Sequence, residues 1–346
     1  ARESVLEPGL PPAPRRRWLA RGAIAVGALV IALSLWGGKR WWDAEAADYR
    51  NNRLYKPIDA VAHVHAENGQ RVLRLEITDP KFARSAPLVP DHGKLMHLFL
   101  VREPKLDAFA HLHPIKRDRK MFETVIPGLP AGSYRLYADV TYETGYSDTL
   151  TTAVEVPENP SDSSGASRSA ALDADDSWRI APAPAGNGPE CRLTPGYTMT
   201  WLAPLRIGLN QPITLRFTLR NAEGQPVLPD PYLGMRGHLA LRRDDGAVFT
   251  HLHPGGSASM AAMQLSVLRA EGKLPLNAAF GADDPLCQLP AESAASQEWL
   301  AGRAGDEAVS FPYAFPKTGR YRLWVQVKVK GQILTGVYDV EVGKGG

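Results

Sequence analysis

A long uncharged apolar run lies near the start of the chain, and short runs of alternating apolar and polar residues follow it. Residues 22–38 carry no charge over 17 positions. At about 1.5 Å of rise per residue, such a run is just long enough to cross the hydrocarbon core of a bilayer. From about residue 56, the alternation with period two is typical of half-buried strands. The pattern predicts one transmembrane helix followed by an all-β body.

Turn signals and shifts in composition divide the all-β body into two modules. Strand-like runs fill residues 56–157 and 191–346, and the stretch 158–190 between them is rich in Ser, Ala, Asp and Pro, as linkers are. Short strands at close spacing predict a β-sandwich in each module. We expect an insertion at about 255–310 in the second module. The acidic run Asp173–Asp176 is interpreted as a solvated part of the linker.

The two modules repeat the same signals in the same order. The tetrapeptide "HLHP" occurs at His111–Pro114 and again at His251–Pro254. Further along, "LPAGSYRLYADV" in the first module matches "FPKTGRYRLWVQV" in the second. Such self-similarity indicates a duplicated structural unit.

The charges around the apolar run predict its topology. We expect a cytoplasmic tail at 1–17, a transmembrane helix at 18–38 and a juxtamembrane collar at 39–55. Arginines concentrate before the helix, which places the N-terminus in the cytoplasm and the modules in the periplasm, at a bacterial inner membrane. The alternative is a cleaved signal peptide, for which Ala44–Ala46 offers a cleavage site. We expect a retained anchor.

Small residues recur four positions apart along the expected helix. Ala23 pairs in this way with Gly27, and Ala28 pairs with Ala32. Small residues at this spacing let helices approach closely within a bilayer. The expected partners are therefore lipid and the integral membrane subunits of a larger complex.

Composition and missing motifs exclude several classes of protein. The net charge is only +3 and forms no long basic stripe, so no nucleic-acid partner is expected. Motifs for a hydrolase nucleophile, a zinc protease, a phosphate-binding loop or a dinucleotide site are missing, which favours a protein that is not an enzyme. The two cysteines, Cys191 and Cys287, are expected to form one disulfide that pins the insertion.

Histidines gather on the second repeated hairpin. A two-residue turn at Asp245-Gly246 would place His238 directly opposite His253 on the neighbouring strand. His251 would share their face, because side chains alternate along a strand. The leucines between these positions would point to the other face. Three imidazoles would then form one patch.

The first hairpin allows the same arrangement. A three-residue loop, 104–106, brings His97 opposite His113, with His111 on the same face. Imidazole triads suit zinc or copper. A blue-copper centre is excluded because it requires a cysteine ligand and neither cysteine lies beside a histidine. The alternative is that the histidines only pack and form hydrogen bonds, since duplication alone also repeats a motif.

The pairs "MHLF…HLHP" and "GHLA…DDGAVFTHLHP" resemble a module of bacterial envelope proteins, known as uncharacterised secreted domains with an immunoglobulin-like or cupredoxin-like fold. The resemblance covers most of 56–157 and 196–345. It implies that fold for both modules and implies no activity. The overall layout also resembles a periplasmic accessory subunit of a bacterial photosynthetic reaction-centre and light-harvesting complex. In such a subunit one helix lies among others, and a β-rich body sits outside.

Two functional hypotheses follow. In the first, the protein is a non-enzymatic structural subunit that braces a larger membrane complex, photosynthetic or otherwise engaged in electron transfer. In the second, it is a periplasmic copper- or zinc-binding protein that uses the two histidine triads.

Overall fold

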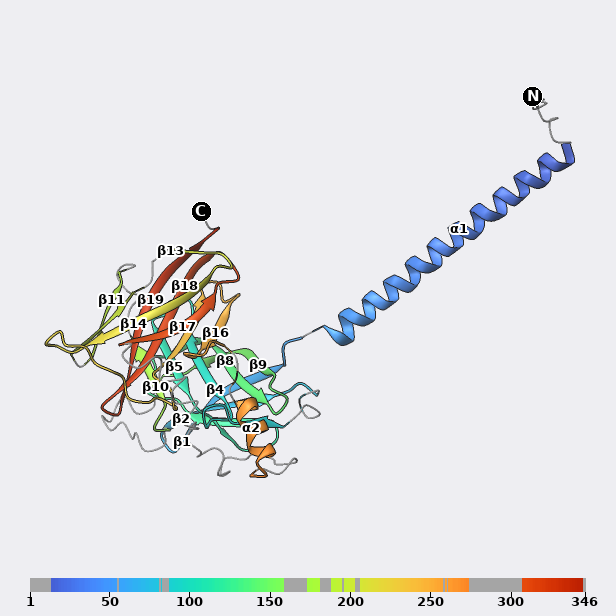
Figure 1. Ribbon diagram of the computed structural model, residues 1–346. Helices are drawn as coiled ribbons and strands as arrows, with labels where there is room; N and C mark the ends of the chain where they lie inside the picture. The colour runs from blue at the N-terminus through green and yellow to red at the C-terminus, as the bar shows by residue number, and fades with distance from the viewer. Residues whose placement is uncertain are drawn as a thin grey trace, which may run out of the picture. The chain divides into compact units, whose positions relative to one another are not determined.

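The computed structural model describes residues 14–54, 56–80, 82, 87–158, 173–180, 188–194, 196–202, 206–257, 259, 261–273 and 307–344. The chain forms two compact units, residues 1–56 and residues 57–346 (Figure 1). Each unit is described by itself.

The first unit is a single long helix. It comprises α1 (Pro14–Asp48) and one π-helical turn, η1 (Tyr49–Arg53). The span Arg17–Asn51 is long and apolar enough to cross a membrane, and its apolar window is not buried against protein. Part of the expected collar at 39–55 therefore continues the helix. The small residues Ala23 and Gly27 lie on this exposed segment.

The first module is a sandwich of two sheets. The smaller sheet has the strand order β1-β2-β7-β6, and the larger has β10-β5-β4-β8-β3, with β9 also pairing with β8. The smaller sheet consists of β1 (Ala60–Glu67), β2 (Gln70–Ile77), β6 (Ile115–Lys116) and β7 (Met121–Val125). The larger consists of β3 (Leu88–Val89), β4 (His97–Arg102), β5 (Ala108–Leu112), β8 (Gly132–Tyr142), β9 (Ser147–Val156) and β10 (Ser177–Ile180).

The second module repeats this design. Its sheets have the orders β11-β12-β14-β17 and β13-β19-β18-β15-β16. The first consists of β11 (Glu190–Leu193), β12 (Tyr197–Trp201), β14 (Pro212–Arg220) and β17 (Ala308–Ala314). The second consists of β13 (Arg206–Gly208), β15 (His238–Arg243), β16 (Phe249–Leu252), β18 (Gly319–Val329) and β19 (Gln332–Gly343). The predicted all-β fold with one N-terminal helix is confirmed.

Strand alternation gives each large sheet two buried faces. In β4, Leu98 and Leu100 point into the core of the first sandwich. The intervening Phe99 points outward and joins a separate apolar cluster with Ala240 and Trp324 of the second module. The outer faces of the two large sheets therefore pack against each other.

Aromatic and charged contacts fix this packing. The Phe109 and Trp324 rings stack with centroids 4.8 Å apart, and those of Tyr137 and Phe249 stack at 3.9 Å. The buried Arg242 guanidinium of the second module donates to the Tyr137 hydroxyl at 2.8 Å and pairs with a carboxylate of the first module, Glu103.

Two segments outside the repeated strands also belong to the first module. Strand β10 comes from the predicted linker and pairs with β5 at the edge of the large sheet (Figure 1). Helix α2 (Ala261–Ala270) comes from the predicted insertion, and its Ala261 is buried in the core of the first sandwich. The linker and the insertion thus tie the two modules together. Cys287 lies outside the described residues, so its disulfide with Cys191 stays a prediction.

Candidate metal centre

The histidine faces of the two modules meet at the packed outer sheets. Each face results from strand alternation, because His97, Phe99 and Val101 share one side of β4 while the leucines between them share the other. The meeting produces one cluster of buried imidazoles, each at most 7% exposed: His92, His97, His111, His113, His238, His251 and His253. The remaining two histidines, His63 and His65, lie on β1, away from the cluster.

The predicted registers are confirmed. In the first hairpin Leu98 pairs with Leu112, so that His97 and His113 take the next opposed positions. In the second, Leu239 pairs with Leu252, which gives the same relation between its two outer histidines. The second turn differs from prediction. Gly246 N donates to Arg243 O at 2.9 Å, and the loop spans residues 244–247 rather than two residues. The register is unchanged because the observed loop has one more residue on each side of the predicted two-residue turn.

The first triad consists of His97, His111 and His113, and one ring nitrogen from each lies within 4.8 Å of the others. His97 Nε2 lies 3.0 Å from the backbone oxygen of Asp91, which can only accept. His97 Nε2 therefore carries the proton of the neutral ring, and Nδ1 carries a lone pair.

His111 is oriented by two acceptors at its Nδ1. Gln326 Oε1 lies 2.9 Å away, and the Tyr232 hydroxyl lies 3.3 Å away. That hydroxyl donates its own proton to the backbone oxygen of Asp175 at 2.9 Å, so its lone pairs face the imidazole. His111 Nδ1 is then the protonated nitrogen, and Nε2 carries the lone pair. This Nε2 lies 3.1 Å from His97 Nδ1. Two lone pairs therefore face each other at hydrogen-bonding distance without a proton between them.

His113 completes the first triad, and its outer ring nitrogen also faces an acceptor. Its Nδ1 lies 2.9 Å from Asp176 Oδ1, and this oxygen also accepts the backbone N–H of His113 at 2.8 Å. Its Nε2 is buried and has no hydrogen-bond partner among the described residues. A carboxylate that holds the outer nitrogen of an imidazole is the usual second-layer arrangement around a bound metal.

The second triad consists of His238, His251 and His253 and repeats this geometry. His238 Nε2 faces the backbone oxygen of Tyr232 at 3.2 Å, and His251 Nδ1 faces Asp139 Oδ2 at 3.5 Å. The inner nitrogens, His238 Nδ1 and His251 Nε2, lie 3.0 Å apart. This approach matches that of His97 and His111, but the contact of His251 Nδ1 with Asp139 is longer than the acceptor contacts of the first triad.

Each module helps to orient the triad of the other. Gln326 lies opposite His238 on β18 of the second module, yet it binds His111 of the first. Asp139 lies opposite His97 on β8 of the first module, yet it faces His251 of the second. The exchange is reciprocal, so neither triad is complete without the module interface.

Burial keeps the imidazoles neutral. Loss of solvent lowers the pKa of His97 to about 4, and it lowers the pKa of the other five triad histidines well below the ordinary range, with neighbouring imidazoles adding to the effect. Burial also raises the pKa of Asp139 and of Asp176 to about 7. A proton shared between two imidazoles is therefore disfavoured, whereas the neutral ring is the form that binds metals.

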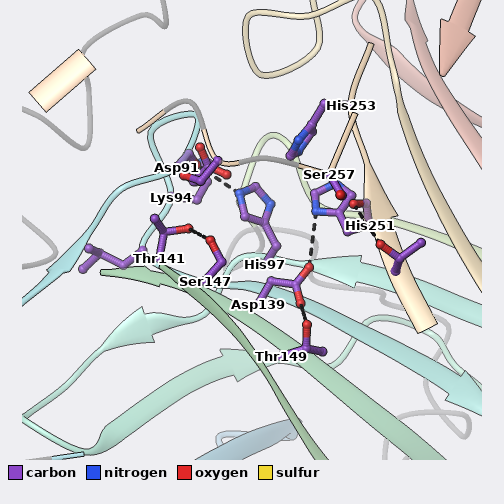
Figure 2. Close-up of a pocket in the computed structure, with 13 residues that line it drawn as sticks. Asp91, Lys94, His97, Asp139, Thr141, Ser147, Thr149, His251, His253 and Ser257 are labelled. Carbon is purple, nitrogen blue, oxygen red and sulfur yellow. Dashed lines mark hydrogen bonds and ion pairs between the residues drawn. The ribbon is translucent and has the colours of Figure 1, made fainter. Parts of the chain in front are cut away.

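A pocket of about 180 Å³ opens beside both triads. Figure 2 shows His97 of the first triad and His251 and His253 of the second around it, with Asp91 at the edge. Lys94, Leu95, Asp139 and several hydroxyl groups line the rest of the wall. The pocket therefore reaches the centre from the side of His97, His251 and His253.

Sequence reasoning missed the residues that orient the imidazoles. Asp176 was expected to be a solvated linker residue; this is wrong, because its side chain is buried against His113. Its neighbour Asp173 binds the Lys94 ammonium with both oxygens at 2.7 Å. His92 was not among the predicted ligands, although the His-Gly pair five residues before the first triad is typical of a tight turn.

The predicted structural residues belong to other elements than the histidine centre. Cys191 Sγ accepts from the backbone N–H of Val337 at 3.4 Å in the second module. Ala23, Gly27, Ala28 and Ala32 lie on α1, in the other unit.

Comparisons with known proteins give a family but no activity. The model of the family "Domain of unknown function (DUF8832)" matches residues 59–158 and 192–344, which are the two sandwiches. No curated protein matches the chain.

Solved structures give only weak likenesses. A biofilm-associated protein (BSP domain) is 10% identical with a TM-score of 0.19, covering 86% of this chain and 32% of that one. The fibronectin(III)-like modules of Clostridium thermocellum CbhA are 9% identical with a TM-score of 0.18, covering 83% and 94%. The surface layer protein SbsC, domains 4–9, is 13% identical with a TM-score of 0.19, covering 83% and 31%. The chain thus spans about a third of the biofilm-associated chain. Overlap at these scores carries no argument about function.

Proposed function

The chain belongs to this family of unknown function, and from its buried histidines we propose that it is a metal-binding protein of the bacterial envelope. Each triad holds one divalent ion, zinc or copper. The role is binding, in keeping with a sequence that carries no catalytic motif.

One observation carries the proposal. In the first triad, two inner nitrogens that bear lone pairs face each other at 3.1 Å, and the second triad brings the equivalent nitrogens to 3.0 Å. Hydrogen-bond acceptors hold the protons of His97, His111 and His238 on the outer nitrogens. Opposed lone pairs repel each other in a buried site, where solvent does not screen them. A metal ion bound between them removes this repulsion, because both lone pairs then coordinate the ion. A purely structural hydrogen bond would need a proton at this place.

The donor set limits the choice of metal. Each triad offers three neutral imidazoles, and no thiolate is available among the described residues, since Cys191 packs elsewhere. Three imidazoles with an open fourth position suit Zn²⁺, and imidazole nitrogen also suits Cu²⁺.

The location is also part of the proposal. We infer that α1 anchors the protein in the cytoplasmic membrane with its arginine-rich end inside, so that the modules lie in the periplasm. Metal ions would reach the centre there through the pocket beside His97 and His253.

Metal stoichiometry tests the proposal. We expect the full-length protein in detergent to bind at least two Zn²⁺ ions in equilibrium dialysis followed by elemental analysis. His111→Gln removes the central ligand of the first triad and His251→Gln that of the second, and each variant should lose at least one ion. His65→Gln is the matched control because its imidazole lies on β1, outside the cluster. Circular dichroism verifies that each variant folds.

The proposal fails if the wild-type protein binds no zinc, or if both triad variants bind as much zinc as His65→Gln does. To separate lost ligands from lost fold, His113→Gln provides a second variant at the edge of the first triad. It should also lose an ion.

A structural role in a membrane complex is a second candidate. The observation that favours it is the apolar helix, whose small residues Ala23, Gly27, Ala28 and Ala32 lie on an exposed segment. The partner could be a photosynthetic reaction-centre and light-harvesting complex or another electron-transfer complex. Extraction from native membranes in mild detergent, native-gel sizing and mass spectrometry test it. A large band with fixed subunits supports this role, and a band near the monomer mass excludes it.

A further inference from the structure

A third group of ligand atoms spans the module interface. It consists of Asp91 and His92 from the first module and His253 from the second, and one ligand atom from each lies within 4.8 Å of the others. The His92 and His253 ring centroids are 4.5 Å apart. We call this group the bridge site.

The ligand atoms of the bridge site are buried and unpaired. Asp91 Oδ1, His92 Nε2 and both ring nitrogens of His253 have no hydrogen-bond partner among the described residues. The three residues are between 4% and 8% exposed. A buried polar atom without a partner is costly because it loses its hydrogen bonds to water, so four such atoms at one place indicate a missing ligand. Asp91 Oδ1 and His92 Nε2 are 3.5 Å apart, too far for a good hydrogen bond.

His253 belongs to two groups at once. It is a member of the second triad and of the bridge site, and both of its ring nitrogens lack a hydrogen-bond partner among the described residues. Its counterpart in the first triad, His113, lacks this freedom because Asp176 holds its Nδ1. The duplicated hairpins therefore differ at their third histidine, because His253 has both ring nitrogens available for metal ions and His113 has only one.

We propose that the bridge site binds one further divalent cation and that the His253 ring joins this ion to the ion of the second triad. The inference rests on the proposed function, since the bridge needs an occupied second triad. When the further ion binds, the remaining N–H bond of His253 breaks and its electron pair forms the new bond to the metal. The proton passes to water in the pocket, which Asp91 and His253 line. No oxidant or reductant is involved.

The turn that carries His92 supplies a matched substitution. His92 has φ 51° and precedes Gly93, and Leu233 of the second module has φ 51° and precedes Gly234. Both turns place one residue in the left-handed region before a glycine. His92→Leu thus installs the side chain that the second module already carries at the same backbone conformation, and it removes one ligand without new strain.

Zinc stoichiometry and copper spectroscopy test the inference on the full-length protein in detergent. We expect the wild-type protein to bind one Zn²⁺ more than His92→Leu, while His63→Leu on β1 matches the wild type. Asp91→Asn is the second variant and should also lose this ion, since its backbone oxygen still holds His97. With Cu²⁺, the bridged pair should couple magnetically, so that the integrated electron paramagnetic resonance intensity falls below the copper content. His92→Leu should restore it.

Two results would overturn the bridge site while leaving the triads intact. One is equal zinc content in the wild type, His92→Leu and Asp91→Asn, together with loss of zinc in His251→Gln. The other is full copper signal intensity in the wild-type protein at saturation. If the wild type binds no ion, the proposed function fails first.

Discussion

The first and second triads are built on equivalent hairpins, but their third histidines are held differently. In the first triad Asp176 fixes the outer nitrogen of His113, and the carboxylate comes from the segment that joins the modules. In the second triad no described residue holds His253 in the same way. The two hairpins therefore form equivalent frames, and the segment that joins the modules holds the third histidine only in the first triad. The second triad, whose third histidine is not held in this way, is the one that can take a further ligand.

Acid should have the largest effect, because it acts on both triads at once. Burial lowers the pKa of all six imidazoles below the ordinary value near 6.5. As the pH falls through about 6.5, the unfolded chain binds protons that the folded chain does not, so stability is full above this pH and declines below it. At about pH 5, His97 alone costs about 2 kcal/mol of stability relative to neutral pH, because its folded-state pKa is about 4.

Asp139 and Asp176 oppose this trend. Their folded-state pKa of about 7 lies above the ordinary value, so they gain protons in the folded protein as the pH falls. Two carboxyls cannot offset six imidazoles, and the net effect is destabilisation. Denaturant unfolding of the metal-free protein at about pH 7 and about pH 5 measures it. A midpoint that does not fall would contradict the account.

Opening the module interface should have the next largest effect, since each triad borrows an orienting group from the other module. Arg242→Ala leaves the Glu103 carboxylate with only the 3.6 Å contact to Arg135 of its own module, and we expect the free energy of unfolding to fall by about 3 kcal/mol. Both triads should then bind zinc more weakly. Arg320→Ala is the control, because Arg320 is largely exposed and pairs with Asp339 within the second module. Equal losses in the two variants would argue against a shared interface.

A smaller effect should distinguish the two triads, because it should weaken zinc binding at the first triad alone. Asp176→Asn removes the charge behind His113, and the zinc affinity of the first triad should fall by about 10- to 100-fold. The second triad should keep its affinity, because Asp176 does not contact it. Competitive titration against a chelator resolves the two classes of site. An equal loss at both would show that the triads are not independently oriented.

The smallest effect is expected at the other orienting carboxylate, Asp139. Asp139 lies 3.5 Å from His251 Nδ1, a longer contact than the 2.9 Å at Asp176. Asp139→Asn should therefore weaken zinc binding at the second triad by less than about tenfold. The same chelator titration checks it. A loss larger than that of Asp176→Asn would reverse the proposed ranking of the two carboxylates.

Local regularities made the triads predictable. Alternation along β4 and β15 places the histidines on one face, and the loop lengths set the register that opposes His97 to His113. The turn around Gly246 adopts a different form, but the register survives because a symmetric loop leaves the pairing unchanged.

The merging of the triads could not be predicted. It depends on two outer sheet faces that pack across about 140 residues of sequence, and no local pattern encodes that docking. For the same reason, Gln326 and Asp139 gave no signal as orienting groups, since each serves a histidine of the other module. Asp176 looked solvated because its sequence neighbours are acidic, yet the strand that follows it, β10, pairs with β5 and brings Asp176 to His113.

X-ray absorption of the zinc-loaded, full-length protein tests the central claim most directly. If the inner nitrogens of the triads hold the metal, the spectrum will show nitrogen neighbours at about 2.0–2.1 Å and the outer-shell scattering of about three imidazoles per ion. A first shell without imidazole scattering would contradict the account and leave the histidines as packing residues.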